Sequence, residues 1–399
     1  MMRRLLLLAT VLPAIARAQG RLTGVTNSDA TPQFNYWTFS SSNAVQPDQL
    51  GGDSVRVAHV WQFSIPIDVA IPIGDRITVD ASGAWQTGSV DLAAPDTALR
   101  TDHYTLSGLT DIKLRMVARV VGDNVLLTLG VNAPTGTTSL SAEQYKALRI
   151  LAAPALELPN ATLGTGPGGV VGLVLAKHIA GWSWAIGGSY ELRGSYVPIE
   201  AYAAFAAAPD YRPGNTAHFE LGADGYIGSS NMTLGLTGNV YQHDALTTTD
   251  SGGAKYTAKV HLGPSFQATW QWAFATPGFR ELSLYAVDRY RTKYDEGGPA
   301  IAGTSGNYLD AGLRGAVPLG EFTSWTFGLG FVDQTGLSID NSFATAGIVG
   351  GTVTLGLAHD FGAYRLEPFI RGGYGKLDMG THNPSAASLG GGVVFRLRI

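Results

Sequence analysis

The 399-residue sequence contains no cysteine, so disulfide frameworks and thiolate chemistry are excluded. It has few charged residues (15%), yet no apolar run beyond its first residues approaches the ~20 residues that a membrane-spanning helix requires. A helical membrane protein is therefore excluded. Basic residues are also scarce, 27 against 31 acidic ones, so we expect no nucleic-acid partner.

What is present at the N-terminus has the organisation of a secretory signal peptide. Arg3 and Arg4 form a positive region, an apolar core follows over Leu5–Leu12, and Ala16 and Ala18 offer an A-x-A cleavage site. The apolar core is too short to cross a bilayer. We therefore predict a signal peptide at residues 1–18 and an exported mature chain.

Apolar and polar residues alternate with period two along much of the remaining sequence. Between Lys255 and Trp272 the even positions are mostly apolar and the odd positions mostly polar, and Val55–Ile71 repeats the pattern. Successive side chains of a strand point to opposite faces, so each segment predicts a strand between two different solvents. Strands this long exceed those of ordinary globular sheets and suit a tilted crossing of a membrane.

The links between these segments alternate in length. Short turns such as Ala180–Gly181 and Phe361–Ala363 alternate with long links such as Thr137–Pro167. Short periplasmic turns and long outer loops are typical of outer-membrane barrels. We predict an all-β, up-and-down antiparallel transmembrane barrel over residues 33–399, with about sixteen strands. Twelve or fourteen remain compatible, because the first segment, Gln33–Ser40, alternates poorly.

The C-terminal residues support a location in the cell outer membrane. Val393, Phe395, Leu397 and Ile399 alternate with a second face up to the last residue. Such a terminal strand resembles those read by the outer-membrane assembly machinery, which we expect as a partner beside outer-membrane lipid. Ile399 departs from the usual terminal Phe or Trp.

Two segments have no partner strand in this arrangement and are candidates to enter the lumen. The first is residues 19–32, which we expect to be available as a lumen plug. The second is the Thr137–Pro167 link, where Ser141 is placed to cap a short helix with Gln144 at the capping-box position. A barrel of about sixteen strands leaves an aqueous lumen, so either segment would narrow it.

Charged residues that share the inner parity of their strands are the candidate functional residues. They either pair across strands and hold the interior, or line a wet path and set solute preference. The predicted lumen-lining residues are Asp111, Lys113, Arg115, Arg119, Glu191, Arg193, Lys255, Lys259, Asp310, Arg314, Arg365, Glu367 and Arg371. Both signs of charge occur, so we expect no strong ion selectivity.

Catalytic and metal-binding patterns are not found in the sequence. The eight histidines are scattered, and none lies in an H-E-x-x-H or similar ligand spacing. A lipase-type site would require a Ser, a His and an acid to converge, and only His218 with Glu220 or His243 with Asp244 offers a starting pair. We therefore predict no catalytic residues, no metal and no cofactor.

Short motifs within residues 105–245 resemble one family of exported barrels. They are Gly-Leu-Thr-Asp-Ile-Lys-Leu at 108–114, Leu-Gly-Val-Asn-Ala-Pro-Thr-Gly at 129–136, Leu-Gly-Thr-Gly at 163–166, and the glycine-containing stretches 210–214 and 221–223. The family comprises outer-membrane proteins named for the meta-pathway of phenol degradation or described as transporters. Thr110 departs from its second glycine. The resemblance implies a barrel that passes small, often aromatic or apolar, compounds, and it implies no catalytic residues.

Two functional hypotheses follow. The first is a channel or transporter for small solutes, and the second is a barrel that serves as the scaffold of an enzyme or an adhesin. Conductance or liposome-swelling measurements distinguish them.

Overall fold

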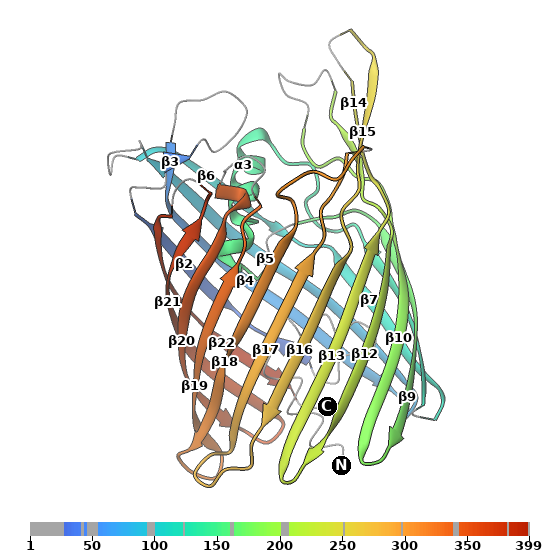
Figure 1. Cartoon of the computed structure of the whole chain (residues 1–399), viewed down its shortest axis with the longest axis vertical. Coiled ribbons are helices and arrows are strands. Elements are labelled where there is room, and N and C mark those ends of the chain that lie inside the picture. Colours follow the sequence, from blue (N-terminus) through green and yellow to red (C-terminus); the bar gives the residue numbers. More distant parts are fainter. Residues whose placement is uncertain are drawn as a thin grey trace.

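The structure is a computed structural model that describes residues 28–40, 44–45, 55–93, 100–122, 124–159, 163–200, 207–249, 252–296, 298–337, 343–380 and 383–397. These residues form a closed antiparallel β-barrel with sixteen strand positions (Figure 1). The predicted fold class is confirmed, and the alternatives of twelve and fourteen strands are excluded.

The wall contains most of the β-strands. In chain order these are β1 (Ser28–Ala30), β2 (Gln33–Phe39), β3 (Ala44–Val45), β4 (Val55–Ile73), β5 (Ile77–Ala93), β6 (Arg100–Leu109), β7 (Ile112–Val121), β8 (Val125–Ala133), β9 (Gly168–Ile179), β10 (Trp182–Arg193), β12 (Thr216–Ile227), β13 (Ser230–Tyr241), β16 (Ser265–Ala273), β17 (Glu281–Arg291), β18 (Gly306–Pro318), β19 (Thr323–Gln334), β20 (Gly347–Asp360), β21 (Tyr364–Asp378) and β22 (Ser385–Leu397). Two positions are interrupted. β1 and β2 both lie between β22 and β4, and β6 and β7 both pair with β5.

The first wall position begins earlier than predicted. Ser28 pairs with Leu397 of β22 and Asp29 pairs with Asp68 of β4, so β1 belongs to the wall. Pro32 separates β1 from β2 because proline cannot donate to the ladder. The prediction of a lumen plug at residues 19–32 is therefore wrong for 28–30. Residues 1–27, with the predicted signal peptide, lie outside the described residues, and the predictions for them stay predictions.

Turn lengths differ between the two ends of the barrel, as the sequence predicts (Figure 1). At one end consecutive strands are joined by short turns. One of the two-residue turns is Ala180–Gly181, where both residues have positive φ, 51° and 82°. This conformation matches the tight hairpin turn whose twist suits antiparallel strands. The long links lie at the opposite end, which we assign to the outside of the cell.

One predicted strand is divided in two. The sequence predicts a continuous strand from Lys255 to Trp272, but β15 (Lys255–Val260) ends before His261 and β16 begins at Ser265. Pro264 cannot donate to a ladder, and a side chain at Gly263 would collide with the backbone carbonyls of Thr292 and Lys293. β15 pairs instead with β14 (Asp244–Thr249), and β14 with β11 (Asp210–Arg212), in a separate sheet.

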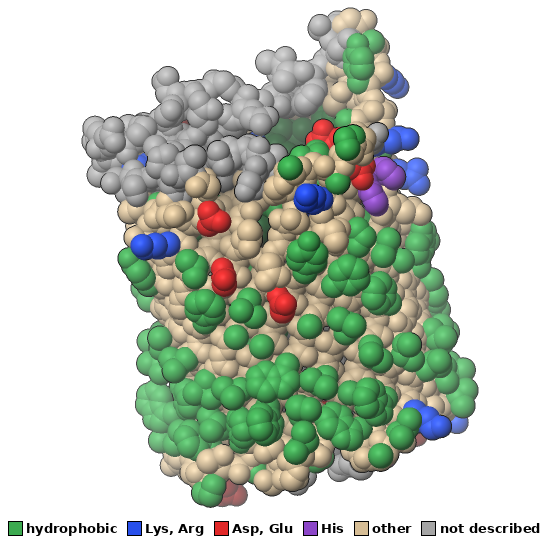
Figure 2. Space-filling model, in the orientation of Figure 1, with side chains coloured by type: hydrophobic (Ala, Val, Ile, Leu, Met, Phe, Trp, Pro, Cys, Tyr) green, Lys and Arg blue, Asp and Glu red, His purple; other side chains and the backbone are tan. Residues whose placement is uncertain are grey.

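The two faces of the wall have the predicted polarity. Leu234 and Leu355 are 37% and 48% exposed on the outer face, whereas their neighbours Thr233 and Thr354 share the inner parity. Figure 2 shows a dense band of apolar side chains across the lower part of the wall on the face in view. An apolar exterior on a closed barrel suits lipid, because closure satisfies every backbone donor and acceptor within the wall.

The described residues include one short α-helix, α3 (Ala142–Leu151), and two 3₁₀ turns, η1 (Pro154–Leu156) and η2 (Phe343–Thr345). Among the described residues no helix has the length and apolar character that a bilayer crossing requires.

Candidate functional site

The helix predicted in the Thr137–Pro167 link is present as α3. Its N-cap is Ser141, whose hydroxyl accepts a hydrogen bond from the Gln144 backbone N–H at 3.3 Å. The Gln144 side-chain oxygen accepts a bond from the Ser141 N–H at 3.0 Å, which completes the capping box. These reciprocal bonds satisfy two backbone donors that a helix start otherwise leaves without partners.

α3 packs against the inner side of the barrel wall. Ala147, Ile150 and Leu151 are buried in an apolar cluster that includes Val60 of β4 and Val90 of β5. Val60 and Val90 are paired across the two strands, and a Cβ at the inner-face Gly88 would lie 3.4 Å from Leu151 Cδ1. The link therefore folds inward, and apolar burial fixes it against the wall.

The same apolar cluster extends past the pairing of β2 with β22 to the strands β20 and β21. Leu156 of η1 is buried with Ile348 of β20 and Leu377 of β21, and Phe343 of η2 packs edge-on to Phe39 of β2 at 5.0 Å. Helix and 3₁₀ turn thus fill one side of the barrel mouth. We call residues 134–167 the inner loop.

Asp111 fastens both ends of the inner loop to the wall. Its carboxylate accepts hydrogen bonds from the backbone N–H groups of Gly136 at 2.9 Å and Thr165 at 2.6 Å, and from the side chains of Thr165 and Asn132. The side chain is only 3% exposed. The prediction that Asp111 lines the lumen is wrong, because the side chain is buried and its contacts are to the two loop ends and to Asn132 of β8.

This arrangement explains the motifs at 108–114, 129–136 and 163–166. All three meet at Asp111, and Gly136 and Gly164 approach so closely that a Cβ on either would lie 2.7–2.8 Å from the backbone of the other. Only glycine fits such a contact. The motifs are therefore structural, and they anchor the inner loop at the junction of β7 and β8.

The inner loop reaches a wall strand on the opposite side of the barrel. The Tyr308 hydroxyl of β18 donates a hydrogen bond to Glu157 Oε1, and β18 is separated from β8 by β9, β10, β12, β13, β16 and β17. Glu157 has a left-handed backbone, with φ at 49°. Such strain in a non-glycine residue persists only where surrounding contacts hold it.

Water reaches the Glu157 side chain, although protein surrounds it. This enclosure raises the pKa of the carboxyl above its ordinary value. The hydrogen bond from Tyr308 and the guanidinium groups of Arg371 and Arg289 act in the opposite direction. The inner loop thus places a carboxylate opposite arginines of the wall.

Most predicted lumen-lining residues lie on the inner face of their strands and pair there. Arg115 Nε lies 3.1 Å from both carboxylate oxygens of Asp80, Arg193 lies 3.2 Å from Glu191, and Arg365 lies 3.1 Å from Glu367. Lys113 and Arg119 share the inner parity of β7 with Arg115. Only the Arg115–Asp80 pair joins two strands, whereas Arg193–Glu191 and Arg365–Glu367 each lie within one strand, so pairing across strands is supported at one of these three positions. Contact of these residues with solute remains a prediction.

A second inner-face group lies along β17, β18 and β21. The Arg314 guanidinium stacks on the Tyr285 ring at 4.0 Å, and the Tyr285 hydroxyl donates to Asp310 at 3.1 Å. Arg371 Nε contacts Thr354 Oγ1 at 3.4 Å. Aromatic rings and charges therefore share the inner surface beneath Glu157.

Two predicted lumen residues are misplaced. Lys255 and Lys259 belong to β15, which pairs only with β14 and is exposed along its length. The β14–β15 hairpin projects beyond the barrel end that carries the long links (Figure 1). The prediction that these lysines line the lumen is wrong, because Gly263 and Pro264 end the wall strand before it reaches them.

Sequence reasoning missed several inner-face residues. Asp80, Glu157, Arg289 and Tyr308 were not among the candidates, although Asp80, Arg289 and Tyr308 share the inner parity of β5, β17 and β18. Parity could have found these three. No local signal identifies Glu157, because its partner Tyr308 lies 151 residues away.

The pairs considered for a lipase-type site are engaged in other contacts. Asp244 accepts hydrogen bonds from the Tyr211 hydroxyl and the Gly214 N–H, both at 2.6 Å. His218 lies 3.2 Å from Glu191 and also contacts Asn239. Within the described part of the chain these contacts are not those of a nucleophile–base–acid triad.

Comparisons with known proteins give distant likenesses. No protein-family profile and no curated protein sequence matches the chain. Solved structures that are similar include the TodX deltaS2S3 mutant monoaromatic hydrocarbon channel (9% identity, 94% of this chain and 92% of that chain covered, TM-score 0.44), a bacterial polysaccharide outer membrane secretin (10%, 94% and 99%, 0.42) and outer-membrane expressed OmpT of Vibrio cholerae (12%, 94% and 98%, 0.37).

These likenesses assign neither a family nor a solute, because identity is low and every TM-score quoted is below 0.5. The architecture itself carries the conclusion. A closed antiparallel barrel of sixteen strand positions has an apolar outer band, short turns at one end and long links at the other. The chain is an outer-membrane β-barrel protein.

Proposed function

We propose that the protein is a passive, restricted outer-membrane channel for small solutes. The observation that carries this proposal is the inner loop, which is fastened at Asp111, seated on apolar wall residues and bonded to Tyr308 across the barrel. A sixteen-strand barrel leaves an aqueous lumen, whereas about eight strands would be filled by side chains. The loop narrows that lumen from one side.

The chemistry of the inner surface supports small, weakly charged or aromatic solutes. Carboxylates and guanidinium groups alternate and pair, so neither sign dominates the wall. The half-buried Tyr308 ring adds flat apolar surface beside Arg289, whose guanidinium lies 5.4 Å from the ring centre. The resemblance to barrels named for phenol degradation agrees with this choice. We propose no enzymatic activity and no cofactor.

Deletion of Leu140–Leu158 tests the proposed constriction. Removal of α3 and η1 should raise single-channel conductance and broaden the range of sugars that swell loaded liposomes, because the lumen loses the segment that narrows it. Deletion of Thr247–Thr257, which shortens the β14–β15 hairpin outside the wall, is the matched control and should leave conductance nearly unchanged.

Assembly of each variant is checked by its change of SDS migration on heating, which reports a closed barrel. An assembled Leu140–Leu158 deletion with wild-type conductance would contradict the proposal. Liposome swelling with neutral, anionic and cationic solutes of equal size then tests solute preference, and a strong preference for one sign of charge would contradict the mixed-charge interpretation.

A further inference from the structure

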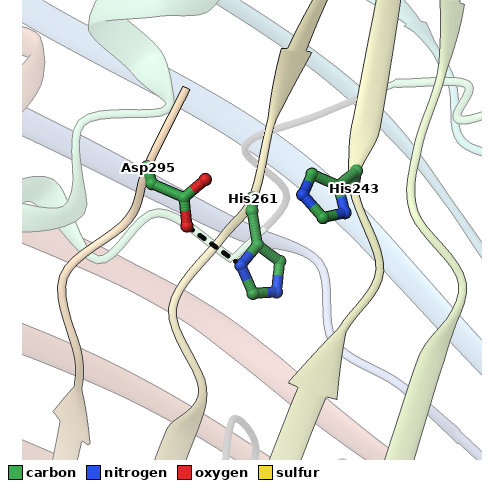
Figure 3. A group of neighbouring side chains, drawn as sticks. All are labelled: His243, His261 and Asp295. Atoms are coloured by element: carbon green, nitrogen blue, oxygen red, sulfur yellow. Dashed lines mark hydrogen bonds and ion pairs between the residues drawn. The ribbon is translucent and has the colours of Figure 1, made fainter. Parts of the chain in front are cut away.

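Three potential metal ligands meet at the base of the β14–β15 hairpin. His243 follows β13, His261 follows β15, and Asp295 lies in the link between β17 and β18 (Figure 3). One ligand atom from each lies within 4.8 Å of those of the other two. In Figure 3 the His261 ring lies between the Asp295 carboxylate and the His243 ring.

The backbone around these residues is held in place. His261 and Asp295 form a two-way bridge, with N···O distances of 2.8 Å from His261 N–H to Asp295 and 3.1 Å in return. Asp244, next to His243, is fixed by Tyr211 and Gly214. The three positions are therefore set by wall and hairpin geometry and not by the side chains alone.

The hydrogen bonds of His261 leave a place for a cation. Its Nε2 lies 2.9 Å from the backbone carbonyl of Tyr241, which can only accept, so Nε2 carries the proton. In the neutral ring Nδ1 then carries a lone pair and can only accept, and it faces Asp295 Oδ2 at 3.2 Å. Two acceptors at this distance require a positive ion between or beside them, either a proton or a metal.

His243 favours the metal. Its ring stacks on His261 with centroids 4.7 Å apart and an interplanar angle of 22°. If His261 is protonated and paired with Asp295, the pair does not involve the neighbouring His243 imidazole, and two imidazolium rings would repel each other. A metal ion uses both nitrogens, and a ligating histidine commonly donates its other N–H to a backbone carbonyl, as His261 does.

We propose that His243, His261 and Asp295 bind a divalent transition-metal ion of the zinc type. Two imidazole nitrogens and a carboxylate match the ligands that Zn²⁺ takes, with a fourth position for water. Metal–ligand distances of about 2.0–2.2 Å require ligand atoms roughly 3.3 Å apart. The ligand atoms lie within 4.8 Å of one another, so the exposed His243 side chain would have to rotate on binding to close the remaining distance.

The ion would join three links that are far apart in sequence. It would fasten the base of the β14–β15 hairpin to the 292–305 link at the outer mouth of the barrel. The His103–Asp91 pair, at 2.6 Å, offers a comparison within the same molecule. It has an exposed histidine beside a carboxylate but belongs to no group of three potential ligands among the described residues.

The test is metal titration of the full-length, tag-free protein in detergent micelles, because a polyhistidine tag would bind the same ions. We expect one Zn²⁺ per chain by calorimetry, with binding that weakens toward acidic pH because protons compete with the metal for the imidazole nitrogens. Co²⁺ should give the visible absorption of a low-coordinate site with nitrogen and oxygen ligands.

His243→Gln, His261→Gln and Asp295→Asn should each weaken binding by more than the ~10–100-fold that loss of an outer-shell partner costs. His103→Gln is the matched control and should bind as the wild type does. Equal binding by all four variants, no binding by the wild type, or loss in only the His261 and Asp295 variants would each overturn the three-ligand site.

A proteolysis measurement separates loss of the ion from loss of the fold. Lys259 is exposed two residues before His261, so trypsin can cleave there. Zn²⁺ should slow this cleavage in the wild type and in His103→Gln, and it should have no effect in the three ligand variants. Each variant must still show heat-dependent SDS migration. Metal-independent cleavage in the wild type would overturn the proposed fastening of the hairpin.

Discussion

The inner surface of the barrel has two unlike halves. Along β4–β6 and β20–β22 the upper inner face is apolar and completely covered, with Val60 and Val90 fully buried under α3. Along β10–β18 the inner face carries polar residues that hydrogen-bond in pairs, His218 with Glu191 and Arg289 with Gln267. The first half is a seat for the inner loop, and the second is the wall that water can reach.

The difference shows that the alternation of apolar and polar residues along a strand depends on what the inner face of the strand contacts. Where the lumen is wet, inner residues are polar and the alternation is clear, as in β13. Where α3 covers the wall, both faces of a strand are apolar, and the bulge between Val57 and His59 of β4 also shifts the parity. Loss of alternation near a strand end is thus a sign that a segment packs inside.

The largest expected effect comes from a charge in the apolar seat. Ile150→Asp places a carboxylate in the cluster beneath α3, and a buried charge without a partner costs roughly 3–5 kcal/mol. The inner loop should leave its seat, and conductance should rise toward that of the Leu140–Leu158 deletion. Ile150→Val, at about 0.5–1.5 kcal/mol, should keep wild-type conductance. Similar conductance in both variants would show that the cluster does not hold the loop.

The next effect contrasts the two faces of the polar half. Leu234→Arg puts a charge on the lipid side of β13 and should cost about 2–4 kcal/mol if it lies near the midplane. Thr237→Arg, three residues along on the inner face, should be milder because water reaches that side. Urea unfolding of the refolded barrels in lipid measures both. Equal destabilisation would contradict the assigned parity, and Leu355→Arg with Thr354→Arg repeats the test on β20.

A smaller effect is expected where the seat meets the wall. Asp111→Ala leaves the N–H groups of Gly136 and Thr165 without their carboxylate, at about 1.5–3 kcal/mol for a hydrogen bond to a charged group. The loop stays seated by its apolar face, but its ends loosen. Single-channel records should show more frequent transitions to larger conductance. Asp80→Asn, which affects an inner ion pair away from these ends, is the control, and identical noise in both would contradict the anchoring role of Asp111.

Much of the wall could be predicted from sequence because lipid and water impose a strict alternation on neighbouring residues. The parity of Leu234 and Leu355, the order of short and long links, and the cap of α3 at Ser141 are all local patterns. The roles of Asp111 and Lys255 could not be predicted from local patterns, because other residues determine them. Asp111 is defined by loop residues up to 54 positions away, and Lys255 left the wall because of Gly263 and Pro264.

The candidate sites were predicted less well for the same physical reason. Glu157 and Tyr308 meet only because the inner loop crosses the barrel, and His243, His261 and Asp295 meet only because three outer links converge. Ligand-spacing rules describe residues on one helix or one hairpin, so they did not detect a cluster of this kind.

The smallest expected effect concerns the contact between the two halves. Enclosure by protein raises the pKa of Glu157, and an unseated loop would return the carboxyl to its ordinary value in water. A raised pKa means that protonation favours the seated loop. This contribution is therefore fully present below the ordinary carboxyl pKa and is lost as pH rises through the raised one. Wild-type conductance should increase modestly with pH over that window. Glu157→Gln keeps an acceptor for the Tyr308 hydroxyl and cannot ionise, so its conductance should stay flat at the low-pH value. A wild-type channel with no pH dependence, or a Gln variant that keeps it, would show that Glu157 does not couple the loop to the polar half.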